Sequence, residues 1–284
     1  MSKLNSENCH CEHQEVIRGN LEIIDFHTHA FADDLAQKAM KALSAGCPDV
    51  PYYLNGTIAD LLKSMDLAGI SKSVICSIAT KPKQFQPILD WSLQIQSDRI
   101  IPLASVHPLD EQRDEHIKQV RDAGLKGLKL HPYYQDFYVD EDNMLKYYEQ
   151  VCKHDLILTV HTGFDVAFPH IRRAEPARIL NALKHFPQLK FITTHLGAWQ
   201  MWDEVENEML GKNIYIEISF AMGYLSEKRA KQILENHPED YILFGSDSPW
   251  TDQQNTLNLL KKLQLSDERM KKILSANAKR LLAI

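Results

Sequence analysis

Cysteine is scarce in this 284-residue chain, and its five copies form no disulfide pattern. Their number is odd and their spacing irregular, whereas small secreted domains carry paired cysteines. No apolar run approaches the roughly 20 residues that cross a bilayer, and the first residues, MSKLNSENCHCEH, lack the apolar core of a secretory signal. The sequence therefore predicts a protein of the cytoplasm, without a membrane partner.

Basic residues do not cluster either. Lys and Arg number 32 against 38 Asp and Glu, for a net charge of −6, and they are scattered through helix-like stretches rather than forming the basic stripe of a nucleic-acid binder. No linker rich in Pro, Gly or Ser divides the chain. We therefore expect a polar, disordered tail over residues 1–17, one domain over residues 18–284, and a small-molecule substrate rather than a nucleic acid.

Eight short β-rich runs alternate with longer amphipathic stretches. The runs are LEIIDFHTH, KSVICSI, RIIPLASVHP, LKGLKLHP, LILTVHTG, KFITTHLG, IYIEIS and YILFGSDSP. Repeated strand–helix units imply a parallel sheet with right-handed crossovers, and eight units suit a closed barrel. The predicted fold is α/β, a distorted (β/α)8 TIM barrel, with an open doubly wound sheet as the alternative. Residues 31–57 exceed a minimal crossover and predict a lid or a helical insert.

Polar residues collect at the C-terminal ends of these strands, where barrels build active sites. They are His27, His29, His107, Lys129, His131, His161, His195 and Asp247. His27 and His29 lie two apart in one strand, so both point to the same side and can share one ion. A single histidine is more often a satisfied strand residue, but so many on matching strand ends favour a site.

Two histidines leave most of a metal's coordination shell to water. His161 and Asp247, from other strands, can supply further donors. Such nitrogen and oxygen donors suit one Zn²⁺, with Mn²⁺, Fe²⁺ or Co²⁺ as alternatives. Water on the ion would be acidified toward neutral pH, and His195 could act beside it as acid or base.

Several motifs resemble those of the amidohydrolase superfamily. They are DFHTH at 25–29, GLKLHP at 127–132, TVHTG at 159–163, TTHLG at 193–197 and FGSDSPW at 244–250. The chain is most similar to the amidohydrolase-related branch that includes aminocarboxymuconate-semialdehyde decarboxylase. This resemblance implies a mononuclear metal site with His27, His29, His161 and Asp247 as ligands, and His195 as a catalytic base or proton donor.

Lys129 allows two interpretations. Other superfamily members hold two metals bridged by a carboxylated lysine on the fourth strand, where Lys129 lies. We favour an unmodified Lys129, because a buried amine more often pairs with an acid, here Glu217, or holds a substrate anion as a point charge.

Further candidates for substrate binding lie at strand ends and in the loops that follow. His107 and His131 each precede a proline, and each either lines the pocket or hydrogen-bonds a loop carbonyl and helps the proline to end its strand. Arg172 and Arg173 could grip an anion bidentately or be merely solvated. Trp199 and Trp250 suggest a partly apolar pocket, with core packing as the alternative. The tail motif CHCEH at 9–13 offers soft metal donors without the second half of a zinc module.

The function predicted first is a metal-dependent hydrolase that cleaves a C–N or C–O bond in a small, anionic molecule. Metal-activated hydroxide would attack a polarised carbonyl, Asp247 would accept the proton, and His195 would stabilise or protonate the reacting group. The alternative is a decarboxylase of an unsaturated or aromatic carboxylic acid, and a non-catalytic metal-binding scaffold is less favoured. A homodimer is the expected assembly, because symmetric dimers are commonest.

Overall fold

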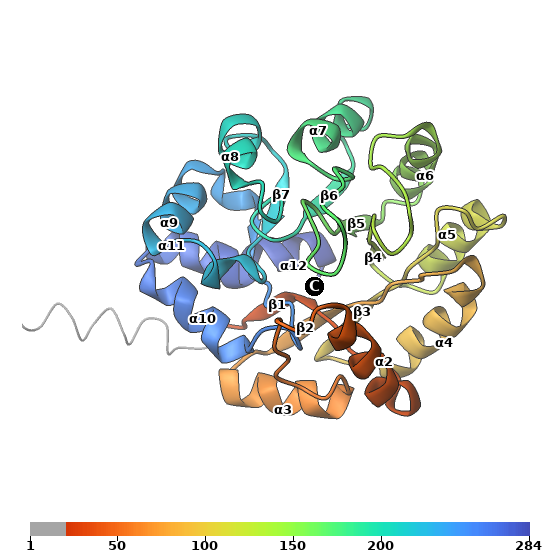
Figure 1. The fold of residues 1–284 in the computed structure, drawn as a ribbon, viewed down its shortest axis with the longest axis horizontal. Coiled ribbons are helices and arrows are strands. Elements are labelled where there is room, and N and C mark those ends of the chain that lie inside the picture. The colour runs from red at the N-terminus through yellow and green to blue at the C-terminus, as the bar shows by residue number, and fades with distance from the viewer. Residues whose placement is uncertain (1–20) are drawn as a thin grey trace, which may run out of the picture.

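All eight predicted strands are present in the computed structural model, which describes residues 21–284 (Figure 1). The predicted tail and its CHCEH motif lie outside the described residues. The strands are β1 (Ile24–Thr28), β2 (Lys72–Cys76), β3 (Ile100–Leu103), β4 (Gly127–Leu130), β5 (Ile157–Val160), β6 (Lys190–Thr193), β7 (Tyr215–Glu217) and β8 (Ile242–Leu243). Each is shorter than the apolar run that predicted it, because residues at the ends of the run, above all the polar ones at the C-terminal end, lie outside the strand.

The strands pair in parallel and in chain order, as two sheets β1-β2-β3 and β4-β5-β6-β7-β8. Single bridges close both seams, one between Ala104 and Leu128 and the other between Thr28 and Ser248. At the second seam the Phe26 amide also donates to the Phe244 carbonyl at 2.8 Å. A doubly wound sheet would reorder its strands, so the closed, distorted barrel is confirmed and the open alternative is excluded.

Helices form a ring around the strands (Figure 1). They are α3 (Ile58–Ala68), α4 (Phe85–Ile95), α5 (Arg113–Asp122), α6 (Asp142–Lys153), α7 (Pro176–His185), α8 (Trp202–Glu204), α9 (Glu227–Asn236), α10 (Gln253–Lys262) and α11 (Asp267–Lys271). Short 3₁₀ or π segments are η1 (Pro82–Gln84), η2 (Val205–Met209), η3 (Ala221–Gly223), η4 (Glu239–Tyr241) and η5 (Lys272–Ala276). Side chains cap two of these helices: Ser226 accepts from the Arg229 amide at the start of α9, and Asp252 accepts from the Asn255 amide at the start of α10.

One buried cluster fills the barrel interior. It takes side chains from β1, β2, β3, β5, β6 and β8, among them Phe26, Val74 and Leu243. Ala278 and Leu281 of α12 (Asn277–Leu282) complete this cluster, so the last helix covers one end of the barrel. The interior is therefore a packed core, and the site lies at the other end.

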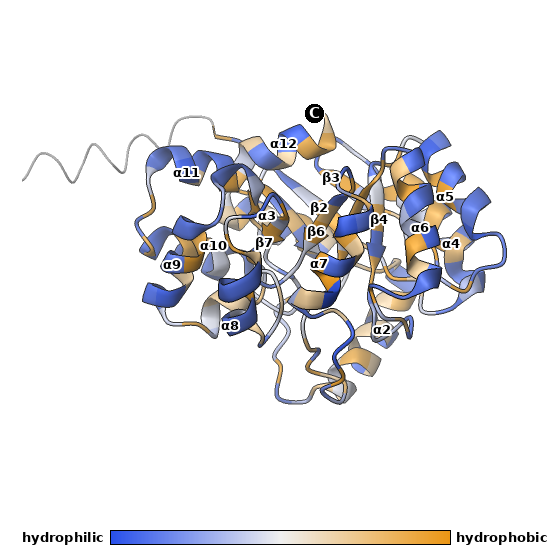
Figure 2. Cartoon of the chain, turned by 90° about the horizontal axis from the view of Figure 1, so that it is seen from above, coloured by the Kyte–Doolittle hydropathy of each residue, from blue (hydrophilic) through white to orange (hydrophobic). Residues whose placement is uncertain are grey.

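The predicted insert is helical. Residues 31–57 contain α2 (Asp33–Gly46), which lies on the side of the molecule opposite α12 (Figure 2). Within residues 21–284 we find no helix that is both long and apolar enough to cross a membrane.

Candidate metal centre

A cavity of about 830 Å³ opens where the strands end. Nine of the predicted site residues line it: His27, His29, Lys129, His131, His161, His195, Trp199, Asp247 and Trp250. They come from β1, β4 and the segments that follow β1, β4, β5, β6 and β8. The C-terminal strand ends therefore converge on one site, as the barrel requires.

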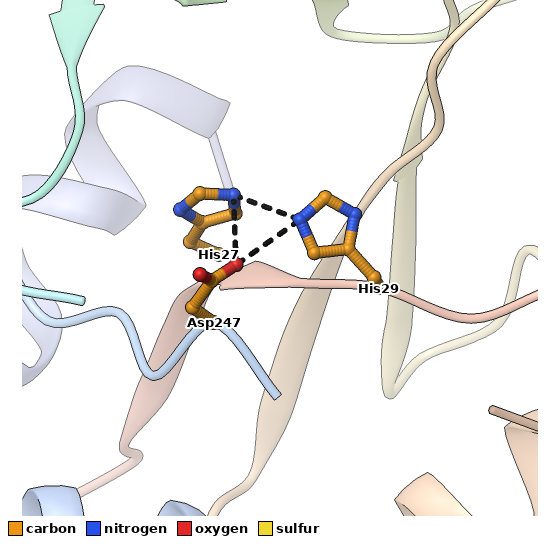
Figure 3. Close-up of side chains that lie close together, drawn as sticks. All are labelled: His27, His29 and Asp247. Carbon is orange, nitrogen blue, oxygen red and sulfur yellow. Dashed lines mark hydrogen bonds and ion pairs between the residues drawn. The ribbon is translucent and has the colours of Figure 1, made fainter. Parts of the chain in front are cut away.

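Three of these residues, His27, His29 and Asp247, bring donor atoms face to face (Figure 3). The Nε2 atoms of His27 and His29 are 3.1 Å apart. Oδ1 of Asp247 lies 3.1 Å from His29 Nε2 and 3.5 Å from His27 Nε2. All three side chains are buried or nearly so.

These separations fit a divalent cation. Tetrahedral ligands at the usual zinc distance of about 2.0–2.1 Å lie about 3.3 Å from one another, close to the three separations observed. Burial holds the pKa of His27 well below its ordinary value, so its ring is neutral and can present a lone pair. His161 is not part of this close group, and its role as a fourth ligand stays a prediction.

Glu217 on β7 fixes the ring of His27. Its Oε1 lies 3.0 Å from His27 Nδ1, so the ring proton sits on Nδ1 and Nε2 is left for the cation. Such carboxylate–histidine pairs orient metal ligands and raise their basicity. Gly245 makes room for this contact, because a Cβ there would lie 2.4 Å from Glu217 Oε2 and 3.0 Å from His27 Cβ.

Glu217 also holds the strand end that carries His195. Its Oε1 accepts from the His195 amide at 3.0 Å, and its two oxygens accept from the amide and hydroxyl of Ser219, each at 2.7 Å. His195 and Asp247 have φ angles of 58° and 68°, a left-handed conformation that is uncommon outside glycine and often found at functional sites. The Asp247 amide is held by the His27 carbonyl at 2.7 Å.

His161 and His195 form a linked pair. His161 Nε2 lies 2.9 Å from the Phe164 carbonyl, so it carries the proton and Nδ1 is an acceptor. That Nδ1 lies 3.1 Å from His195 Nε2. His195 Nδ1 lies 3.2 Å from the Ser219 carbonyl, so both ring nitrogens of His195 face acceptors. Burial lowers the pKa of His195 well below its ordinary value and that of His161 to about 3.

A second group of potential donors, His131, His161 and Asp165, lines the same cavity. The two imidazoles are stacked, with centroids 4.1 Å apart and planes 15° from parallel. Imidazole lone pairs lie in the ring plane, so stacked rings direct them side by side rather than at one ion. Asp165 Oδ2 instead accepts from His131 Nε2 at 3.3 Å, and we interpret this group as a hydrogen-bonded wall.

The predicted pairing of Lys129 with Glu217 is wrong. Lys129 takes part in no ion pair among the described residues, and Glu217 is instead bound to His27 and Ser219. Lys129 Nζ lies 3.1 Å from His27 Nε2. Burial lowers the pKa of this amine, because desolvation disfavours the charged form.

Asp25 was not found from the sequence. It is fully buried and accepts from the Ser246 amide at 2.9 Å, the Ser246 hydroxyl at 2.6 Å and Gln253 at 2.8 Å. Burial raises the pKa of Asp25 to about 6. These hydrogen bonds of the Asp25 carboxyl link β1 to the segment that carries Asp247, so Asp25 helps to position the metal centre.

Three predicted substrate-binding residues do not line the cavity. His107 is buried, and its Nδ1 accepts from the Leu109 amide at 3.1 Å. Arg172 is half exposed and pairs with Glu204, whereas Arg173 pairs with Asp136 at 2.6 Å and lies over Tyr138. The structure therefore places these three side chains outside the cavity, each in contact with another partner.

Both predicted tryptophans are placed at the cavity. Trp199 is 2% exposed and packs against Phe220, with ring centroids 4.8 Å apart. Trp250 is partly buried and packs on the core under β8. Both interpretations therefore hold, since these rings pack on the core and also form the apolar wall.

The family model for amidohydrolase matches residues 24–284. The chain therefore belongs to the amidohydrolase family, and it is an enzyme of the amidohydrolase superfamily with a divalent-metal site. The search of curated proteins gave no significant match.

Solved structures share the fold over 93% of the chain. They include an uncharacterised TIM-barrel protein, Bb4693 from Bordetella bronchiseptica (TM-score 0.75, 19% identity, 99% of that chain). A second is 2,6-dihydroxybenzoate decarboxylase from Rhizobium (TM-score 0.69, 17% identity, 99% of that chain). A third is 5-carboxyvanillate decarboxylase from Novosphingobium aromaticivorans, complexed with manganese and a nitrobenzoic acid (TM-score 0.70, 15% identity, 97% of that chain).

Proposed function

We propose that the protein is a metal-dependent decarboxylase of an unsaturated or aromatic carboxylic acid. The observation that carries the proposal is the ring-lined wall of Trp199, Phe220 and Trp250 in the cavity that holds the three metal donors. Such a wall can contact the planar, apolar body of an unsaturated acid, while the carboxylate of the acid binds the cation that the three donors hold. Two of the structural relatives are decarboxylases of aromatic acids, which supports this choice over hydrolysis.

His27, His29 and Asp247 would hold one divalent cation, with His161 as the predicted fourth ligand. Two or three imidazoles and one carboxylate suit Zn²⁺ first, and Mn²⁺, bound in one structural relative, is the leading alternative before Fe²⁺ and Co²⁺. When bound, the cation supplies Lewis-acid polarisation of the substrate's oxygen atoms.

The side chains of the cavity supply the remaining chemistry. Lys129, a buried amine beside His27, donates to the substrate carboxylate. The bond between the carboxyl carbon and its neighbour breaks, CO₂ leaves, and the neighbouring carbon keeps the electron pair and takes a proton. His195 delivers this proton, since its ring lines the cavity with Nε2 beside His161 Nδ1.

Hydrolysis of a C–N or C–O bond is the second candidate. It is favoured by Asp247, whose Oδ1 faces the two histidines while Oδ2 makes no hydrogen bond within residues 21–284. That free oxygen is placed to accept a proton from water.

Released CO₂ separates the two candidates. Protein loaded with Zn²⁺ or Mn²⁺ is incubated with a panel of aromatic and unsaturated acids, and separately with lactones and amides in ¹⁸O-labelled water. Decarboxylation predicts CO₂ and the proton-substituted product, both lost in His195→Ala and kept in Glu149→Gln, a change on the exposed face of α6. Incorporation of ¹⁸O without CO₂ would establish the hydrolase, and turnover of neither panel by metal-loaded protein would favour the non-catalytic scaffold.

The homodimer, the cytoplasmic location and the absence of a nucleic-acid partner stay predictions.

A further inference from the structure

The insert helix α2 lines the cavity with one face. Its lining residues are Leu35, Lys38, Ala39, Ala42 and Leu43. Their spacing of three and four residues defines a single helical stripe, and four of the five are apolar. Lys38 is the one charged residue on this stripe.

The opposing wall repeats this pattern. Gln84, Pro87, Ile88 and Trp91 line the cavity along η1 and α4, again at helical spacing. Lys81, just before η1, lines it as well. Figure 1 shows α2 and α4 on the same side of the barrel, so the cavity extends from the metal centre into a groove between these two helices.

Neither lysine is neutralised by the protein. Lys38 and Lys81 are exposed and take part in no ion pair in the part of the chain that the structure describes. The acids that line the cavity are Asp165 and Asp247, and each already faces histidines. In a chain of net charge −6, this groove is therefore locally cationic, which concentrates anionic ligands at its mouth.

We propose that the substrate carries a second anionic group, at the far end of an apolar body, which binds between Lys38 and Lys81. The inference rests on the proposed function, in which the first carboxylate lies at the metal centre. The apolar stripes of α2 and α4 contact the body of the substrate, and the two lysines pair with the distal anion as point charges. The cavity of about 830 Å³ lies near the top of the range of small-molecule sites, about 300–1,000 Å³, so an elongated diacid fits.

Matched pairs of acids test this subsite. Full-length protein loaded with Zn²⁺ is titrated calorimetrically with benzoate against isophthalate and terephthalate, and with biphenyl-4-carboxylate against biphenyl-4,4′-dicarboxylate. The cavity variant is Lys38→Gln/Lys81→Gln. The control is Lys41→Gln/Lys83→Gln, which removes the same charge from the same segments at exposed positions that do not line the cavity. Metal content and melting temperature are measured for both variants.

The best diacid should bind wild type at least about tenfold more tightly than its monoacid, and about 0.5 M salt should reduce this preference. The cavity variant should lose the preference, while the control keeps it. Equal binding of diacids and monoacids to wild type would overturn the subsite and leave the proposed function standing, as would a preference that the cavity variant retains or that the control also loses. Failure of every acid to bind metal-loaded wild type would overturn the carboxylic-acid function, and the subsite with it.

Discussion

Replacing Glu217 by glutamine is expected to weaken metal binding, although Glu217 is not itself one of the proposed metal ligands. The carboxylate accepts four hydrogen bonds, from His27 Nδ1, the His195 amide, and the amide and hydroxyl of Ser219. An amide in this place has one acceptor oxygen. Whichever way it turns, its NH₂ group faces a backbone N–H, that of Ser219 in one orientation and that of His195 in the other.

The magnitude follows from these contacts. Loss of a carboxylate behind a metal-bound histidine typically reduces metal affinity 10–100-fold, because His27 then faces a neutral amide instead of the carboxylate that keeps its proton on Nδ1. Turning the NH₂ donor of the amide toward a buried N–H donor should also lower the free energy of unfolding of the apoprotein by about 1–3 kcal/mol. For a domain of this size, that corresponds to a fall in melting temperature of roughly 2–12 °C.

Competition with a chromophoric chelator measures the affinity, and thermal melting of the apoprotein measures the stability. Glu149→Gln is the control, since it makes the same change on an exposed helix face. Unchanged affinity in Glu217→Gln, with stability equal to that of the control, would refute the role assigned to Glu217. Reduced stability with unchanged affinity would show that Glu217 supports the fold alone.

Three further outcomes are expected. Burial raises the pKa of Asp25 from 3.8 to about 6. As the pH rises through this interval, the free energy of unfolding of wild-type apoprotein should therefore fall by up to about 3 kcal/mol relative to that of Asp25→Asn. Urea denaturation measures both proteins, and an equal change of their free energies with pH would contradict this. Lys129→Met should retain one metal per chain by elemental analysis but bind carboxylic acids more weakly, whereas two metals in wild type and one in the variant would indicate a carboxylated lysine. Gly163→Ala should destabilise the fold by at least about 3 kcal/mol, because φ is 83° and a Cβ would lie 2.1 Å from the Trp199 nitrogen; a melting temperature within about 2 °C of wild type would be inconsistent with this clash.

The barrel and the polar strand ends could be predicted because both follow from local periodicity. Alternation places His27 and His29 on one side of β1, and the position of each apolar run shows where its strand ends. Residues 31–57 are longer than a minimal crossover, and this length predicts either a lid or a helical insert. The structure shows the helical insert.

The partners of the site residues could not be predicted in the same way. Glu217 meets His27 across 190 positions of sequence and Asp25 meets Ser246 across 221, contacts that exist only once the barrel closes. Alternation gives the side of a strand to which a side chain points and not its neighbour there, so the sequence does not show that Lys129 Nζ lies against His27 Nε2 instead of Glu217. Arg172 and Arg173 lie in a loop whose path depends on the outer helices, and acids outside the cavity bind them.

The most direct test of the metal centre is a crystal structure with anomalous diffraction data collected at the absorption edge of the metal that copurifies with the protein. We expect one peak per chain, about 2.0–2.3 Å from His27 Nε2, His29 Nε2 and Asp247 Oδ1, and the same map shows whether His161 is a ligand. A fully occupied peak between His131 and Asp165, or metal-loaded crystals with no peak at His27, would contradict this expectation.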